Sequence, residues 1–236
     1  MTRASVERPQ AASPRPERAG QAMIVVLGTL QVRRGDPDGR LLPAGLAAEV
    51  ALAIGRQGGA VEVVGSIGDD PEGDAVVVEL GRAGVGHAAL LRDPALRTSA
   101  LGAARDDRRR SRYDAADIEL GLRYLPGCRV IVITDILDDA ELQAALAGAE
   151  FHAAAVVIVA PPGSIDATSL GDAVTLLEHP RPEDDEDAAD DSEVVPDEAA
   201  FAAFIADYAL RLDRGETPAE AFGRALGDGA WERSPD

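Results

Sequence analysis

Short aliphatic runs alternate along this chain with segments in which apolar residues recur at helical spacing. Five runs are typical of strands buried on both faces of a sheet, and they lie at 23–27, 61–64, 130–134, 155–159 and 174–177. Segment 47–54 illustrates the helical spacing, with apolar residues at i, i+3, i+4 and i+7. Strands that alternate with helices predict an α/β fold, in which a mostly parallel central sheet has helices on both faces.

The other helices are expected from the same spacing, and they lie at 72–83, 139–149, 201–212 and from 218 onward. Local signals mark their ends. Gly58-Gly59 should stop the first helix, because glycine adopts a positive φ without steric cost. Asp69 and Asp70 stand where they could cap the second helix, and Thr217 begins a T-P-A-E capping box with proline at N1.

Four stretches interrupt this pattern. Residues 1–21 lack the apolar core of a signal peptide and predict a disordered tail, which leaves 22–236 as a single domain. Residues 29–42 predict a polar loop or flap. Residues 88–113 are expected to complete that lid, with short strands at 90–91 and 98–101.

The fourth stretch, residues 183–198, contains ten acids and no base. Such a charge density cannot be buried, and its self-repulsion predicts a solvated, extended loop. A tract that binds a metal ion or a partner is the alternative interpretation.

Charge and composition restrict the partners. The chain of 236 residues has a formal net charge of −19 and no lysine, which argues against nucleic acid or an anionic membrane as a partner of the bulk surface. No apolar run approaches the roughly 18 residues of a membrane span. The single cysteine, Cys128, excludes an internal disulfide and suits a reducing compartment, so we expect a cytoplasmic protein.

Several common site motifs are missing. A G-x-x-x-x-G-K-[ST] phosphate loop is impossible without lysine, no G-x-G-x-x-G follows a strand, and no G-x-S-x-G marks a nucleophilic serine. His87, His152 and His179 are scattered and have no cysteine partner, so no zinc site is indicated.

Two longer motifs nevertheless resemble those of a known family. A strand that ends in Gly28 is followed by P-A-G-L-A-A-E-V-A at 43–51 and by G-S-I-G-D-D-P-E-G at 65–73, and the two closing helices at 200–225 also match. In the ribokinase-like (PfkB) carbohydrate kinases the corresponding motifs are P-G-G-x-x-x-N-x-A and G-x-x-G-x-D-x-x-G. The resemblance implies a ribokinase-like fold, a sugar or nucleoside ligand, ATP with Mg²⁺ as cofactors, and a homodimer formed through the lid.

The phosphoryl-transfer motif of that family is degenerate in this chain. The family's G-A-G-D, which supplies a catalytic aspartate and amides for the phosphate, aligns with 196–199. Ala199 therefore occupies the position of the base and cannot accept a proton. A shift of one or two residues would offer Asp197 or Glu198 as the substitute, without the family's glycines.

The sugar and metal positions are altered as well. Arg33 stands where the family has an aspartate, Glu49 where it has an asparagine, and Gly45 is the retained glycine of Pro-Gly-Gly. Of the family's N-x-x-E motif near magnesium, only Glu183 agrees. The chain then passes almost directly to its closing helices, so the C-terminal half of the ribokinase-like fold is reduced. The glycines of 65–73 could serve backbone turns alone or contact substrate.

These observations predict a homologue of the carbohydrate kinases in which ATP-dependent transfer to a sugar hydroxyl is weak or absent. ATP and Mg²⁺ would be its cofactors if it is active, and otherwise it has none. The alternative is a non-catalytic interaction or regulatory protein that uses the retained fold for self-association. A degraded reading frame without a stable fold is the third hypothesis.

Overall fold

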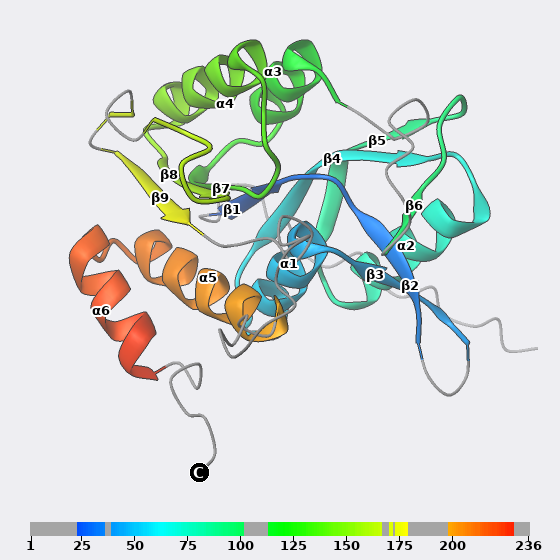
Figure 1. Cartoon of the computed structure of the whole chain (residues 1–236), viewed down its shortest axis with the longest axis horizontal. Coiled ribbons are helices and arrows are strands. Elements are labelled where there is room, and N and C mark those ends of the chain that lie inside the picture. The colour runs from blue at the N-terminus through cyan, green and yellow to red at the C-terminus, as the bar shows by residue number, and fades with distance from the viewer. Residues whose placement is uncertain are drawn as a thin grey trace, which may run out of the picture.

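The structure is a computed structural model, and it describes residues 23–35, 39–101, 113–166, 170–171, 173–178 and 198–228. Its centre is a six-stranded sheet in the order β5-β4-β1-β7-β8-β9, in which every neighbouring pair is parallel (Figure 1). The strands are β1 (Met23–Leu27), β4 (Val61–Gly68), β5 (Gly86–Asp93), β7 (Cys128–Ile133), β8 (Ala155–Ala160) and β9 (Val174–Glu178). The predicted α/β class and parallel sheet are confirmed.

Helices cover both faces of this sheet (Figure 1). The helices on one face are α1 (Leu46–Arg56), α2 (Pro71–Arg82), α5 (Glu198–Asp213) and α6 (Pro218–Asp228). The other face is covered by α3 (Ala115–Arg123) and α4 (Asp139–His152). The central strands are buried on both sides, since Ile24, Val25 and Leu27 of β1 are all 0% exposed. This burial explains why the strands appear in the sequence as continuous aliphatic runs.

Helix α3 is absent from the sequence prediction. Its apolar face consists of little more than Ile118 and Leu122, one i, i+4 pair, which is too short a pattern to recognise by periodicity. The usable signal was its capping box, in which Asp114 and Asp117 each accept the other's backbone N–H, at 3.1 and 3.0 Å. The capping box predicted at Thr217 is confirmed by its bonds with Glu220.

A small second sheet, in the order β3-β2-β6, stands beside the central one. Its strands are β2 (Gln31–Arg34), β3 (Leu41–Ala44) and β6 (Ser99–Ala100). The stretch 29–42, expected as a polar loop or flap, therefore contains two strands paired as a hairpin. Of the stretch 88–113, residues 88–93 belong to β5 of the central sheet and only β6 joins the small sheet, while 102–112 lie outside the described residues.

Helix α5 has a defined direction relative to the sheet. Its Leu210 lies against Gly59, just beyond the C-terminus of α1, and Asp213 at its last turn interacts electrostatically with Arg129 at the start of β7. Because α1 runs antiparallel to the strands, α1 and α5 both begin toward the carboxyl edge of the sheet. No helix in the described part of the chain is long and apolar enough to cross a membrane.

Candidate ligand-binding site

The connections of the chain diverge between β1 and β7. The chain leaves β1 toward α1 on one face of the sheet and leaves β7 toward α4 on the other. Ligands of open α/β sheets bind at such a switch point, beyond the carboxyl ends of the strands. The residues just after β1 and β7 are therefore the first candidates for a binding site.

Polar groups meet at this point. Thr29, after β1, donates both its backbone N–H and its hydroxyl to Oδ2 of Asp135, after β7, at 2.8 and 2.6 Å. The hydroxyl of Tyr113, which precedes α3, donates to the same oxygen at 3.0 Å. Three segments distant in sequence are thus joined by one carboxylate, and it is half-buried at the edge of the sheet.

The strand register places Ser66 of β4 in line with these groups, and we call Ser66, Thr29 and Asp135 the polar row. Leu27 is paired with both Val64 and Ile133, so two residues further along Thr29 lies between Ser66 of β4 and Asp135. Ser66 is 1% exposed, and its Oγ has no hydrogen-bond partner among the described residues. A buried hydroxyl without a partner costs free energy and is uncommon in native folds, so the described residues do not fully satisfy this row.

Gly28 brings the start of α1 close to these groups. A Cβ at Gly28 would lie 2.9 Å from the Cβ of Ala47 and would also meet the hydroxyl of Thr134. Glycine is therefore required where the first turn of α1 crosses the ends of β1 and β7. The amide end of α1, with its partial positive charge, consequently lies next to the polar row.

Of the residues predicted for the sugar pocket, Gly45, Glu49 and Arg33 fall on two elements near this edge. Gly45 precedes α1 with φ 82°, which an L-residue rarely adopts, and the Gln31 side chain lies against it. Glu49 is half-buried in the first turn of α1. Arg33 is exposed on β2, on the same side of the strand as Gln31 by alternation.

The predicted phosphoryl-transfer residues are described only in part. Glu198 is the first residue of α5 and Ala199 the second, and both are exposed at the end of the helix that faces the carboxyl edge. Asp197 and Glu183 lie outside the described residues, as do most of the acidic run and the tail 1–21.

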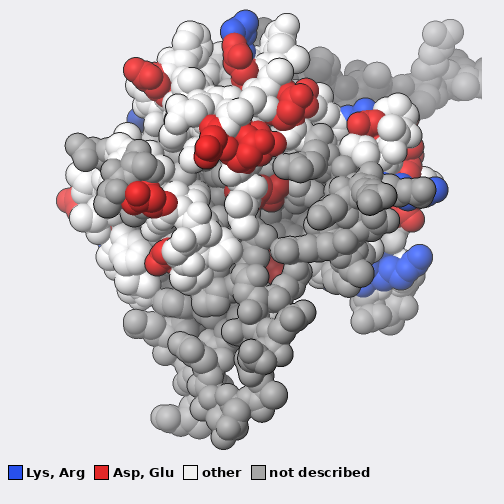
Figure 2. Space-filling view, turned by 45° about the horizontal axis from the view of Figure 1, so that its top comes forward, with Lys and Arg blue, Asp and Glu red and all other residues white. Residues whose placement is uncertain are grey.

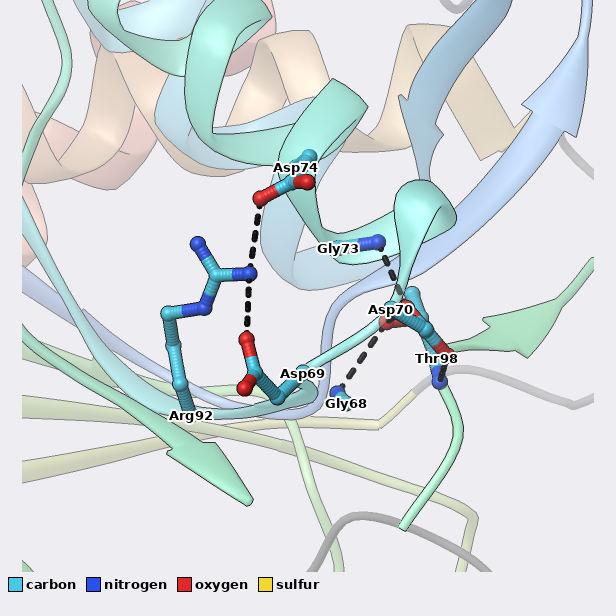
Figure 3. Close-up of polar contacts among 7 residues, drawn as sticks. All are labelled: Gly68, Asp69, Asp70, Gly73, Asp74, Arg92 and Thr98. Carbon is cyan, nitrogen blue, oxygen red and sulfur yellow. Dashed lines mark hydrogen bonds and ion pairs between the residues drawn. The ribbon is translucent and has the colours of Figure 1, made fainter. Parts of the chain in front are cut away.

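The loop between β4 and α2, which contains the G-x-x-G-x-D-x-x-G motif, is held by hydrogen bonds of its own residues and of Thr98 (Figure 3). Asp70 caps α2 by accepting the N–H of Gly73 at 2.8 Å, and it also accepts the backbone N–H and the hydroxyl of Thr98, at 2.8 and 2.7 Å. The Thr98 hydroxyl in turn accepts the N–H of Gly68 at 3.0 Å. A Cβ at Gly68 would lie 2.6 Å from the Thr98 nitrogen, so the backbone explanation of this glycine is supported.

The two acids of this loop differ in environment. Burial alone would raise the pKa of Asp70, but the hydrogen bonds from Thr98 and Gly73, together with the charge of Arg97, hold that pKa below its ordinary 3.8. Asp69 instead points away and forms an exposed ion pair with Arg92, which also binds Asp74 (Figure 3). Asp70 therefore caps the helix as expected, and Asp69 does not.

Other chemically active side chains have ordinary partners. The rings of His87 and His152 lie within hydrogen-bond distance of the carbonyls of Val85 and Leu122. Burial raises the pKa of the Cys128 thiol to about 12, so it is not a reactive thiolate. Among the described residues no group of three histidine, cysteine, aspartate or glutamate side chains could hold a metal ion.

Acidic side chains dominate the surface on the α3–α4 side of the sheet. Figure 2 turns this side toward the viewer and shows carboxylates gathered there with few arginines among them. Both helices begin with acids, Asp114 and Asp117 for α3 and Asp138 and Asp139 for α4. This field disfavours a polyanionic ligand at that surface.

Comparison with known proteins identifies the fold. No family model matches the sequence, and no curated protein matches it either. Aminoimidazole riboside kinase from Salmonella enterica superposes with a TM-score of 0.58 at 16% identity, over 91% of this chain and 94% of that one. Fructokinase with bound ATP from Xylella fastidiosa gives 0.53 at 15% identity, over 86% and 85% of the two chains.

Other sugar kinases align over a smaller part. An uncharacterized sugar kinase from Pyrococcus horikoshii aligns at 17% identity over 58% of this chain and 52% of that kinase, with a TM-score of 0.44. The matches that cover most of both chains establish the architecture. The chain has a ribokinase-like α/β fold, as its two motifs implied.

Proposed function

We propose that this ribokinase-like chain binds a sugar or a nucleoside at the carboxyl edge of its sheet and transfers phosphate to it weakly or not at all. The structural neighbours are named for small hydroxylated substrates, aminoimidazole riboside and fructose. One observation supports a related ligand here: the Asp135 carboxylate, held by Thr29 at the switch point, has its Oδ1 free of hydrogen bonds within the described residues. Such an oxygen can accept a hydrogen bond from a ligand hydroxyl.

The start of α5, in the part that the structure describes, supports the proposed loss of phosphoryl transfer. The first turn of α5 reads Glu198, Ala199, Ala200, Phe201 and contains no glycine. The exposed carboxylate of Glu198 lies at the amide end of the helix, where a phosphate would otherwise be stabilised by the helix dipole. We therefore assign no step to ATP or Mg²⁺. We expect the chain to bind its sugar or nucleoside ligand even where it transfers no phosphate to it.

The direct test is calorimetric titration of the full chain with aminoimidazole riboside, D-ribose and D-fructose, followed by a coupled assay with Mg-ATP. We expect at least one of the three to bind and no turnover above the background hydrolysis of ATP. Absence of binding to all three would refute the ligand proposal. Robust phosphorylation of any of them would refute the proposed loss of catalysis.

The role of Asp135 can be tested by Asp135→Asn. The amide keeps the shape of the side chain but offers an NH₂ group to either the ligand or Thr29, so the affinity for the bound sugar should fall about tenfold. The matched control is Asp139→Asn, which neutralises an exposed carboxylate on the neighbouring helix α4. Equal affinities of the two variants would contradict a contact between Asp135 and the ligand.

A second candidate function is self-association without catalysis. In the described residues the outer strands of the small sheet, β3 and β6, are each paired on one side only, and an unpaired strand edge can pair with another chain. The measurement is light scattering coupled to size exclusion on the full chain. A monomer at every concentration tested would remove this candidate.

A further inference from the structure

One oxygen of the half-buried Asp135 carboxylate accepts three hydrogen bonds. Its Oδ2 accepts the N–H of Thr29 at 2.8 Å, the hydroxyl of Thr29 at 2.6 Å and the hydroxyl of Tyr113 at 3.0 Å. Its Oδ1 accepts no hydrogen bond from the described residues. Three donors on one oxygen and none on the other determine the orientation of the carboxylate plane, because rotating the group would break all three bonds at once.

Tyr113 comes from a different part of the fold than Thr29. Thr29 begins the connection from β1 to the small sheet, whereas Tyr113 is adjacent to Asp114, the N-cap of α3. Tyr113 is 5% exposed and packs in the core on the α3–α4 side, so its ring is held by its surroundings. A rigid hydroxyl donor of this kind limits the rotation of its acceptor.

We infer that Tyr113 is a positioning residue for the proposed binding site: its hydroxyl locks the Asp135 carboxylate so that Oδ1 faces the ligand as a hydroxyl acceptor. This inference rests on the proposed function, because Oδ1 has a role only if a hydroxylated ligand binds there. The contrary interpretation is that the Tyr113 hydroxyl competes with the ligand for Asp135. The two interpretations predict opposite effects of removing the hydroxyl.

The test is Tyr113→Phe, which removes one oxygen and keeps the buried ring. The matched control is Tyr124→Phe, at the other end of α3, whose side chain is 73% exposed. Both variants are first compared with the wild type by thermal melting, to confirm that they fold. Two readouts follow: native-state exchange of the Thr29 amide by NMR, and titration with whichever of aminoimidazole riboside, D-ribose and D-fructose the wild type binds.

If Tyr113 locks Asp135, its loss should speed exchange of the Thr29 amide about five- to tenfold, because that N–H donates to the same oxygen. The sugar affinity should fall by about the same factor, while amides in the middle of α3 and the Tyr124→Phe variant stay unchanged. A general destabilisation would instead speed the exchange of many amides together, which separates positioning from a merely structural effect.

Unchanged exchange of the Thr29 amide in Tyr113→Phe would overturn the inference, regardless of any change in sugar affinity. Faster exchange with equal or tighter sugar binding would also overturn it, in favour of competition by Tyr113. If the wild type binds none of the three sugars, the proposed function fails and the ligand-facing role of Oδ1 fails with it. Binding by the wild type with no response to Tyr113→Phe leaves the function intact and refutes this inference alone.

Discussion

Asp70 holds together the loop between β4 and α2, and replacing it with alanine should be costly for stability. The substitution removes the N-cap of α2, which contributes about 1 kcal/mol in typical helices. It also leaves the N–H of Thr98 and the Thr98 hydroxyl without their acceptor, and hydrogen bonds to charged groups contribute about 1.5–3 kcal/mol each. Because Asp70 is only half-buried, we discount these values and expect a total loss of about 3 kcal/mol.

The measurement is urea denaturation followed by circular dichroism, together with a thermal melt. For a chain of this length, about 3 kcal/mol corresponds to a fall in Tm of roughly 6–12 °C. Asp69→Ala is the control, since it removes only an exposed ion pair with Arg92 and should cost less than about 0.5 kcal/mol. A loss in Asp70→Ala no larger than that of Asp69→Ala would refute the reasoning.

The pH dependence provides a second check on Asp70. Its pKa in the folded chain lies below 3.8, so its stabilising effect is complete above the unfolded pKa and is lost as the pH falls through the folded value. The difference in unfolding free energy between the wild type and Asp70→Ala should therefore be constant from pH 7 down to about pH 5 and should shrink toward pH 3. A difference that does not depend on pH would contradict the proposed charge-assisted bonds.

Two further substitutions test other parts of the fold. Burial raises the pKa of Asp213 above its ordinary value despite the opposing charge of Arg129, and its buried Oδ1 has no partner among the described residues. Asp213→Asn should therefore stabilise the chain by about 0.5–1 kcal/mol at pH 7, measured as a higher urea midpoint. A lower urea midpoint would contradict this prediction. Gly28→Ala should destabilise by about 1–3 kcal/mol, because the new Cβ would overlap Ala47 and Thr134, and an unchanged Tm would show that this region is less tightly packed than described.

Two motifs that carry the family resemblance hold backbone conformations in the described structure. The loop around Asp70 and the glycine before α1 are used to hold backbone conformations, which any descendant of the fold needs whether or not it is an enzyme. Under the proposed function, the residues that would face a phosphate are an alanine and an acid at the start of α5. The titrations with sugars and Mg-ATP described above test that proposal.

Several features of this protein follow from the sequence by itself. Five of the six strands of the central sheet and every described helix except α3 were predicted, because burial on both faces of a sheet and on one face of a helix imposes local patterns on the apolar residues. Strand β5 was expected only as a short strand of the lid, and β2 and β3 were expected as a loop or flap. The caps at Asp70 and Thr217 and the stop at Gly58 were predictable for the same reason, since each depends on neighbours within a few residues. Helix α3 was missed because it has too few apolar positions to define a period.

The meeting of Thr29, Tyr113 and Asp135 could be recognised only from the tertiary structure. Thr29 and Asp135 are 106 positions apart and Tyr113 lies between them, and each is an ordinary polar residue beside an apolar stretch. They meet because β1 lies between β4 and β7, a strand order that the apolar pattern does not encode. The sequence determines which segments become strands through local burial, whereas only the packing of distant strands decides which of their ends meet, and so where a ligand could bind.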